Sequence, residues 1–123
     1  MAKICEYYFA PQSPWAYFGH ARLLALAKQY DVQIEMKPID LPKVFSVSGG
    51  LPLAKRTPQR QAYRLIELKR WSTHLDLPLN PQPKFSPVTG DPAAKLIIAT
   101  KLAHGTDAVS YTHLRAHETL RYL

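Results

Sequence analysis

The sequence predicts an α/β fold in which a strand–helix–strand unit is followed by a mainly helical segment. Residues 3–9 are rich in strand formers, residues 13–29 combine a helix start signal with apolar residues at helical spacing, and residues 32–39 alternate apolar and polar side chains. The three elements span about 37 residues, which is the size of a βαβ motif. Such a motif has parallel strands and a right-handed crossover.

The first predicted strand, residues 3–9, is nearly continuous in apolar character. Ile4, Tyr7 and Phe9 favour extended backbone. A run of this kind is typical of a strand that is covered on both faces. We therefore expect the lone cysteine, Cys5, to be buried in this strand.

After a turn at residues 10–12, the predicted helix begins with two strong signals. Ser13 is a preferred N-cap residue, and Pro14 suits the first helical position, where no intrahelical bond needs its missing N–H. The later residues 32–39 alternate Val, Ile and Met with Gln, Glu and Lys. This alternation predicts a half-buried strand that ends near Pro38.

The segment after this unit is predicted to be helical, with loops between the helices. Residues 41–57 contain several Pro and Gly residues and are predicted to be a linker. Helices are predicted over residues 58–75 and 91–104, each with a proline in its first turn, and Gly105 is expected to end the second in a left-handed conformation. The stretch 77–90 carries four prolines and is predicted to be a loop.

The chain divides into three predicted parts: residues 1–40, a βαβ unit; residues 41–108, a partial helical insertion domain; and residues 109–123, a non-native tail. Eleven consecutive residues, 109–119, fit one reading frame of a transposase-type sequencing adapter. The alternative is a genuine amphipathic tail. We expect the biological sequence to stop near Ala108, inside an open reading frame. Amplification from source DNA should then give different codons after this point, and natural DNA that encodes the same tail would contradict the assignment.

The composition is that of a folded, basic chain about one domain long. Of its 123 residues, 46% are hydrophobic, and the net charge of +7 falls to +6 without the tail. No apolar run approaches the ~18 residues of a membrane span, and no signal peptide is visible, so we expect a cytoplasmic protein with no membrane partner. The single cysteine excludes an internal disulfide, a CxxC redox pair and a cysteine-rich zinc site.

No metal site is predicted. His113 and His117 are four residues apart, a spacing found in metal sites on helices, but they belong to the tail. The histidines elsewhere are isolated, and we expect His20, His74 and His104 to lie at the surface.

The most informative residues for function are Ser13–Ala16, where the first strand meets its helix. In parallel sheets, ligands collect beyond the carboxyl ends of the strands. A helix N-terminus at that place offers unpaired N–H groups and a partial positive charge, which stabilise an anion such as a thiolate. The alternative is that Ser13 only caps the helix, and the local pattern alone favours that interpretation.

Several short motifs occur in order along residues 4–104. They are FAPQSPWAY at residues 9–17, PIDL at 38–41, SGGLPL at 48–53 and Arg70–Trp71. With this order and spacing, the chain resembles the 2-hydroxychromene-2-carboxylate isomerase family, in the DsbA-like and kappa-class glutathione transferase branch of the thioredoxin fold. The resemblance implies a thioredoxin-like βαβ unit with a helical insertion. It also implies that the remaining strands, a helix and a cis-proline loop would follow Ala108, so we expect this chain to be incomplete and a poor catalyst by itself.

The resemblance implies a glutathione-dependent isomerase of aromatic catabolism. The family interconverts 2-hydroxychromene-2-carboxylate and trans-o-hydroxybenzylidenepyruvate through transient addition of a glutathione thiolate. Ser13 stands where redox relatives have their first active-site cysteine, and Ala16 stands at the second, so disulfide chemistry is absent. The Ser13 hydroxyl would instead donate a hydrogen bond to the glutathione sulfur. Because free thiols titrate near ~8.5, this donor and the helix dipole would raise the reactive thiolate fraction.

The resemblance also implies residues that bind glutathione or a small aromatic carboxylate substrate. They are Pro14, Trp15, Gly49, Gly50 and Arg60. Each has a structural alternative. Arg60 lies in a basic set with Arg56 and Arg64 that is typical of a solvated helix face. Aromatic residues pack in cores by default, and we expect Trp71 to do so.

Other functions remain open from the sequence. A kappa-like glutathione transferase, or another oxidoreductase relative of the thioredoxin fold, would use the same activated thiolate, and an inactive fragment is a further alternative. The net positive charge motivates a nucleic-acid-binding module, but the basic residues are scattered and no nucleic-acid motif accompanies them, so we expect no nucleic-acid partner. A homodimer of the full-length protein is also left open.

Overall fold

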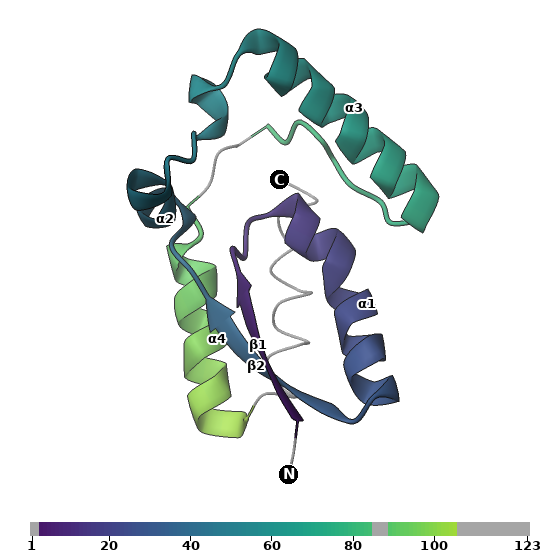
Figure 1. Cartoon of the computed structure of the whole chain (residues 1–123), viewed down its shortest axis with the longest axis vertical. Helices are drawn as coiled ribbons and strands as arrows, with labels where there is room; N and C mark the ends of the chain where they lie inside the picture. The colour runs from purple at the N-terminus through teal and green to yellow at the C-terminus, as the bar shows by residue number, and fades with distance from the viewer. Residues whose placement is uncertain (1–2, 85–88, 106–123) are drawn as a thin grey trace.

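The fold is built on two parallel strands, β1 (Lys3–Phe9) and β2 (Val32–Pro38), which α1 (Pro14–Gln29) connects. The computed structural model describes residues 3–84 and 89–105, so the predicted tail lies outside the described residues. Figure 1 shows α1 and α4 (Asp91–His104) on opposite sides of the strands, with α3 (Pro58–Leu75) beyond the end of the sheet. The predicted strand–helix–strand unit with parallel strands is confirmed.

The register of the two strands brings their ends together. Cys5 lies opposite Ile34, and Tyr7 lies opposite Met36. Beyond the last strand pair, the Ile39 N–H donates a hydrogen bond to the Phe9 carbonyl oxygen, with an N···O distance of 2.9 Å. The chain therefore leaves both strands at the same edge of the sheet, immediately before α1 and before α2 (Leu41–Ser48).

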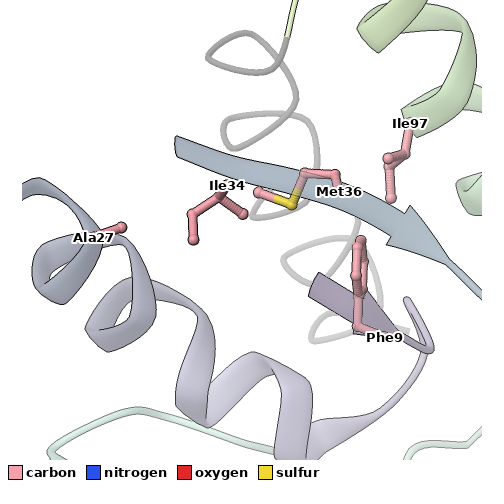
Figure 2. Close-up of a cluster of buried hydrophobic side chains, with 5 residues drawn as sticks. All are labelled: Phe9, Ala27, Ile34, Met36 and Ile97. Carbon is pink, nitrogen blue, oxygen red and sulfur yellow. The ribbon is translucent and has the colours of Figure 1, made fainter. Parts of the chain in front are cut away.

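A small apolar core holds the helices to the sheet. Its buried side chains are Phe9, Ala27, Ile34, Met36 and Ile97, from β1, α1, β2 and α4 (Figure 2). Burying a large aliphatic side chain contributes about 1.5–3 kcal/mol, so even this small cluster makes a substantial contribution to stability. Ile97 is fully buried and is the only buried residue of α4, so it is the main apolar contact between this helix and the sheet.

A lysine of α4 reaches the outer side of β2. The Lys101 ammonium forms an ion pair with Glu35, at 3.2 Å, and donates to the Met36 main-chain oxygen, at 3.4 Å. Helix α4, which lies within the predicted insertion domain of residues 41–108, thus packs directly against the βαβ unit.

The prediction of a linker over residues 41–57 is wrong for its first half, where α2 forms. The Asp40 carboxylate accepts a hydrogen bond from the Lys43 N–H, at 3.3 Å, and so caps the helix N-terminus. Pro42 lies in the first turn, where proline is tolerated. Gly49 ends the helix with a left-handed φ of 75°. A short 3₁₀ helix, η1 (Leu53–Lys55), follows.

The predicted helices over 58–75 and 91–104 are confirmed as α3 and α4. Gly90 takes the N-cap position of α4, and Asp91 lies in its first turn. Gly105 follows α4 with a positive φ of 81°, but its ψ of 179° is extended, so the expected left-handed stop is wrong in detail. Among the described residues, no helix combines the length and apolar character needed to cross a bilayer.

Burial of β1 differs from the prediction of a strand covered on both faces. Cys5 is exposed, and Tyr8 is 57% exposed. The face that carries Tyr8 is polar: Lys37 pairs with Glu6 and with Glu35, and the Tyr8 hydroxyl donates to Glu6 at 2.8 Å. Glu6 and Tyr8, on one face of β1, therefore belong to a network of charged and polar side chains that crosses to β2.

Two expectations about single side chains are also wrong. Trp71 is 41% exposed because its side of α3 is not covered by the described residues. His20, expected at the surface, is fully buried because it lies on the face of α1 that packs against β1, where its ring stacks on Tyr7. His74 and His104 are exposed, as expected.

The cross-strand pair should make stability depend on pH in the acid range. The hydrogen bonds from Lys37 and then from Tyr8 hold the pKa of the exposed Glu6 carboxyl below its ordinary value of 4.5. A carboxyl with a lowered pKa in the folded state contributes stability above its unfolded pKa and loses that contribution as the pH falls. We expect the urea midpoint of the wild type to fall more steeply below pH 4.5 than that of Glu6→Gln. Parallel pH profiles for the two proteins would contradict this.

Candidate active site

A pocket of about 440 Å³, largely open to solvent, lies beside the junction of β1 and α1. This volume falls within the range of about 300–1,000 Å³ that is typical of small-molecule sites. Its walls come from the end of β1, one face of α1 and the segment after β2. The aromatic residues that line it are Tyr7, Tyr8, Phe9 and Trp15.

Local sequence explains why these walls meet. Ala16, Gly19 and Leu23 line the cavity from α1, and their spacing of three and four places them on one helix face. Ile39 lines the opposite wall because its bond to Phe9 holds it at the end of the sheet. Gly19 leaves this part of the wall open, since a Cβ there would meet no atom within 4 Å.

Ser13 lies at the cavity wall as the N-cap of α1. Its φ of −76° and ψ of 122° are extended, and its Oγ accepts a hydrogen bond from the Ala16 N–H at 3.3 Å. The Ser13 N–H donates to the Ala10 oxygen at 2.9 Å, which fixes the loop that carries the hydroxyl. Within the described chain, the hydroxyl hydrogen of Ser13 has no acceptor, so it is available to a ligand.

The N-terminus of α1 is electrostatically suited to an anion. Its first turn contains no acidic residue. Pro14 has no N–H, and the Trp15 N–H belongs to the first turn, whose donors have no intrahelical acceptor. The helix dipole and these donors together favour a negatively charged group beside Ser13.

Tyr7 is a cavity residue that sequence analysis did not single out as functional. Its ring stacks on Phe9, with centroids 4.6 Å apart, and on His20, with centroids 5.9 Å apart. Burial raises the pKa of the Tyr7 phenol above its ordinary 10.0, so this group stays protonated near neutral pH. The only signal in the sequence was its place two residues before Phe9, on the same face of the strand.

The structure brings Trp15 to the cavity together with Ser13. Trp15 is 39% exposed, and its ring meets the Phe18 ring edge-on, at 5.9 Å between centroids. Pro14 is half-buried at the first helical position and is not a wall residue. Its contribution is to fix the backbone that presents Ser13 and Trp15.

Gly49 and Gly50 do not line the cavity and have structural roles. Gly49 is the left-handed C-cap of α2, with a φ of 75°. At Gly50, a Cβ would collide with the Phe45 ring, whose Cε1 would be 3.0 Å away. Both glycines are explained by the end of α2 rather than by contact with Ser13.

The role of Gly49 can be tested by substitution. Gly49→Ala should lower the free energy of unfolding by about 1–2 kcal/mol, because a Cβ disfavours the left-handed conformation. The matched control is Gly19→Ala, which adds a methyl group inside α1 where no atom lies within 4 Å. This control should raise stability by up to about 1 kcal/mol, since Ala favours helix. Urea unfolding of both variants measures the difference, and equal effects would contradict the assignment.

Arg60 is exposed on α3 and does not line the cavity. Arg64, one turn later on the same helix, is half-buried. Burial, and secondarily the positive charge of Arg56, lower the pKa of the Arg64 guanidinium. Of these two arginines of α3, Arg64 is therefore the less exposed.

The described residues offer no metal centre. Within residues 3–84 and 89–105, no three His, Cys, Asp or Glu side chains gather closely enough to hold a metal ion.

Comparisons with known proteins place this geometry in a family. A family-wide sequence profile described as "DSBA-like thioredoxin domain" matches residues 4–119, a range that includes both strands, Ser13 and part of the 109–123 tail. No solved structure matches the chain.

Three curated relatives carry the printed name 2-hydroxychromene-2-carboxylate isomerase. The relative from Sphingobium xenophagum is 29% identical over 80 residues, which are 64% of this chain and 41% of the relative. The relatives from Pseudomonas putida and Pseudomonas sp. (strain C18) are each 31% identical over 77 residues, 62% of this chain and 38% and 36% of the relatives. The chain thus spans about two fifths of the length of the curated relatives it matches.

Proposed function

Because this chain belongs to the DSBA-like thioredoxin domain family, we propose that it is the Ser13-bearing part of a glutathione-dependent isomerase of 2-hydroxychromene-2-carboxylate. The relatives' shared name supports the reaction. Since the chain spans about two fifths of those relatives, the activity is proposed for the whole protein to which it corresponds.

The observation that carries the proposal is the geometry of the Ser13 hydroxyl. Its oxygen accepts from the Ala16 N–H, so the hydroxyl hydrogen is left to donate elsewhere. Ser13 also forms part of the wall of a cavity of ligand size. A donor held in this way can hydrogen-bond a sulfur anion without first rearranging.

The electrostatics of this pocket favour the thiolate of glutathione. Its sulfur would lie at the N-terminus of α1, where Ser13 and the Trp15 N–H face an anion and no acidic residue in the first turn opposes it. When bound, glutathione supplies a thiolate that adds reversibly to the conjugated alkene of the substrate. Because only the thiolate attacks well and free thiols titrate near ~8.5, the donors at Ser13 and Trp15 increase reactivity at neutral pH.

The aromatic walls suit a flat aromatic substrate. Trp15 and Tyr7 offer aromatic rings beside Ser13, and aromatic pairs of this kind contribute about 0.5–1.5 kcal/mol beyond burial. The protonated Tyr7 phenol adds a hydrogen-bond donor. Arg60 of α3 is the family-based candidate to bind the carboxylates of glutathione and substrate.

The proposal is tested on the complete reading frame recovered from source DNA. Conversion of 2-hydroxychromene-2-carboxylate is followed with and without glutathione. We expect conversion to require glutathione and to yield a product of unchanged mass, because an isomerase releases the thiol again. Accumulation of a glutathione conjugate would assign a transferase instead. Conversion that is independent of glutathione would contradict the proposal.

A further inference from the structure

The segment before α3 holds one arginine in a defined position. The Arg56 Nε donates to the Leu51 carbonyl oxygen at 2.9 Å. The Arg56 carbonyl oxygen accepts from the Gln61 side-chain amide at 2.8 Å. Arg56 is thus fixed at both its side chain and its main chain, and only its terminal guanidinium NH₂ groups are left to bind a ligand.

A second arginine lies on the same side of α3. Gln61 and Arg64 are three residues apart in the helix and therefore share a face. Because the Gln61 side-chain amide donates to the Arg56 carbonyl oxygen, the main chain of Arg56 lies beside this same face. Gln61, Arg56 and Arg64 are all half-buried. Consistent with this proximity, the charge of Arg56 adds to the effect of burial in lowering the pKa of Arg64.

No carboxylate balances these two charges in the described part of the chain. Neither Arg56 nor Arg64 forms an ion pair with any residue in 3–84 or 89–105. Glu67, one turn after Arg64, accepts the Tyr63 hydroxyl at 2.9 Å instead. Partly desolvated like charges without a counter-ion are unfavourable, and an oxyanion between them would relieve the repulsion.

We propose that Arg56 and Arg64 form a binding site for a small-molecule oxyanion group that presents paired oxygens, as a carboxylate or a phosphate does. The planar guanidinium matches such a group through two parallel hydrogen bonds. Neither arginine lines the Ser13 cavity, so the site is separate from the thiolate position. It does not depend on the proposed isomerase reaction and can be tested without glutathione or substrate.

The test is an amide NMR titration of the 123-residue chain with malonate, with phosphate, and with sodium chloride at matched ionic strength. We expect saturable shifts over residues 51–64 with malonate or phosphate but not with chloride. Arg56→Gln and Arg64→Gln should each weaken the apparent affinity by about tenfold, since each removes a charge-assisted pair of bonds. The matched control is Lys69→Gln, which removes a charge from an exposed position of the same helix and should leave the affinity unchanged.

The comparison of anions identifies the group. Tighter binding of malonate assigns a carboxylate, and tighter binding of phosphate assigns a phosphate. Arg64→Lys keeps the charge but loses the planar fork, so it should bind with intermediate affinity. Because Arg56 lies outside α3, Arg56→Gln tests the site even if substitution of Arg64 perturbs the helix. The proposal is overturned if the wild type shows no saturable shift at residues 51–64, or if Lys69→Gln weakens binding as much as Arg56→Gln.

Discussion

Ser13→Ala is expected to lower the rate of isomerisation by the complete protein by about 10²–10³-fold, at saturating glutathione, while the protein stays folded. The substitution removes the hydroxyl that we propose to donate to the glutathione sulfur. It also removes the acceptor for the Ala16 N–H, which lies 3.3 Å from the oxygen. Loss of an N-cap by itself lowers stability by about 1 kcal/mol, which a typical domain tolerates.

The matched control for this prediction is Asp40→Ala. Asp40 caps α2 through the Lys43 N–H, so its loss should have a similar effect on stability without removing a group at the sulfur. Turnover and thermal midpoint are measured on the same samples. If the Ser13→Ala protein is folded and has nearly full turnover, Ser13 acts only as a helix cap and the proposed mechanism is wrong.

Ile97→Ala should lower the free energy of unfolding by about 2–5 kcal/mol, the usual range for emptying an aliphatic core position. Ile97 is fully buried and forms the main apolar contact of α4 with the core around Met36. Since a domain is stable by only about 5–15 kcal/mol, the variant should lose much of its stability.

Leu102→Ala is the control in the same helix, because Leu102 is 82% exposed. Its effect should stay within about 0.5 kcal/mol. Urea unfolding followed by circular dichroism compares the two variants. Equal losses would mean that α4 is held by its surface contacts, such as the Lys101–Glu35 ion pair, rather than by Ile97.

The parts of the fold that sequence predicted well have strong local signals. The cap at Ser13 and the proline after it define the start of α1 without reference to the rest of the protein. The same signals were present at Asp40 and Pro42, but Gly49 and the nearby prolines suggested a linker, so α2 was missed. Local chemistry thus locates helix ends better than overall Pro and Gly content does.

Burial was less predictable because it depends on neighbours that are distant in sequence. Nothing local distinguishes His20, which packs on Tyr7, from a solvated histidine. Likewise, the apolar character of β1 did not reveal that Lys37 of β2 would bind Glu6 on its outer face. The Lys37–Glu6 contact follows from the parallel register of the two strands, which only the folded chain defines.

The sequence indicated part of the candidate site but not the rest of its wall. Ser13 and Trp15 follow from one motif, whereas Tyr7 and Ile39 enter the cavity wall through strand pairing. Arg60 was selected by its place in the family pattern. The structure adds that Arg64 is more buried than Arg60, which no sequence pattern revealed.

The hydrogen bond between Ile39 and Phe9 has a consequence for the folding kinetics of the protein. Parallel strands cannot pair through a tight hairpin, so β1 and β2 meet only after α1 has closed a long crossover, which is a slow, non-local event. Before the two strands pair, the chain could form the helix cap at Ser13, but Ile39 would not yet form its part of the cavity wall. A ligand should therefore bind in the cavity only after β1 and β2 have paired. It should slow unfolding more than it accelerates folding. It should also protect α1 and both strands from proteolysis as one unit.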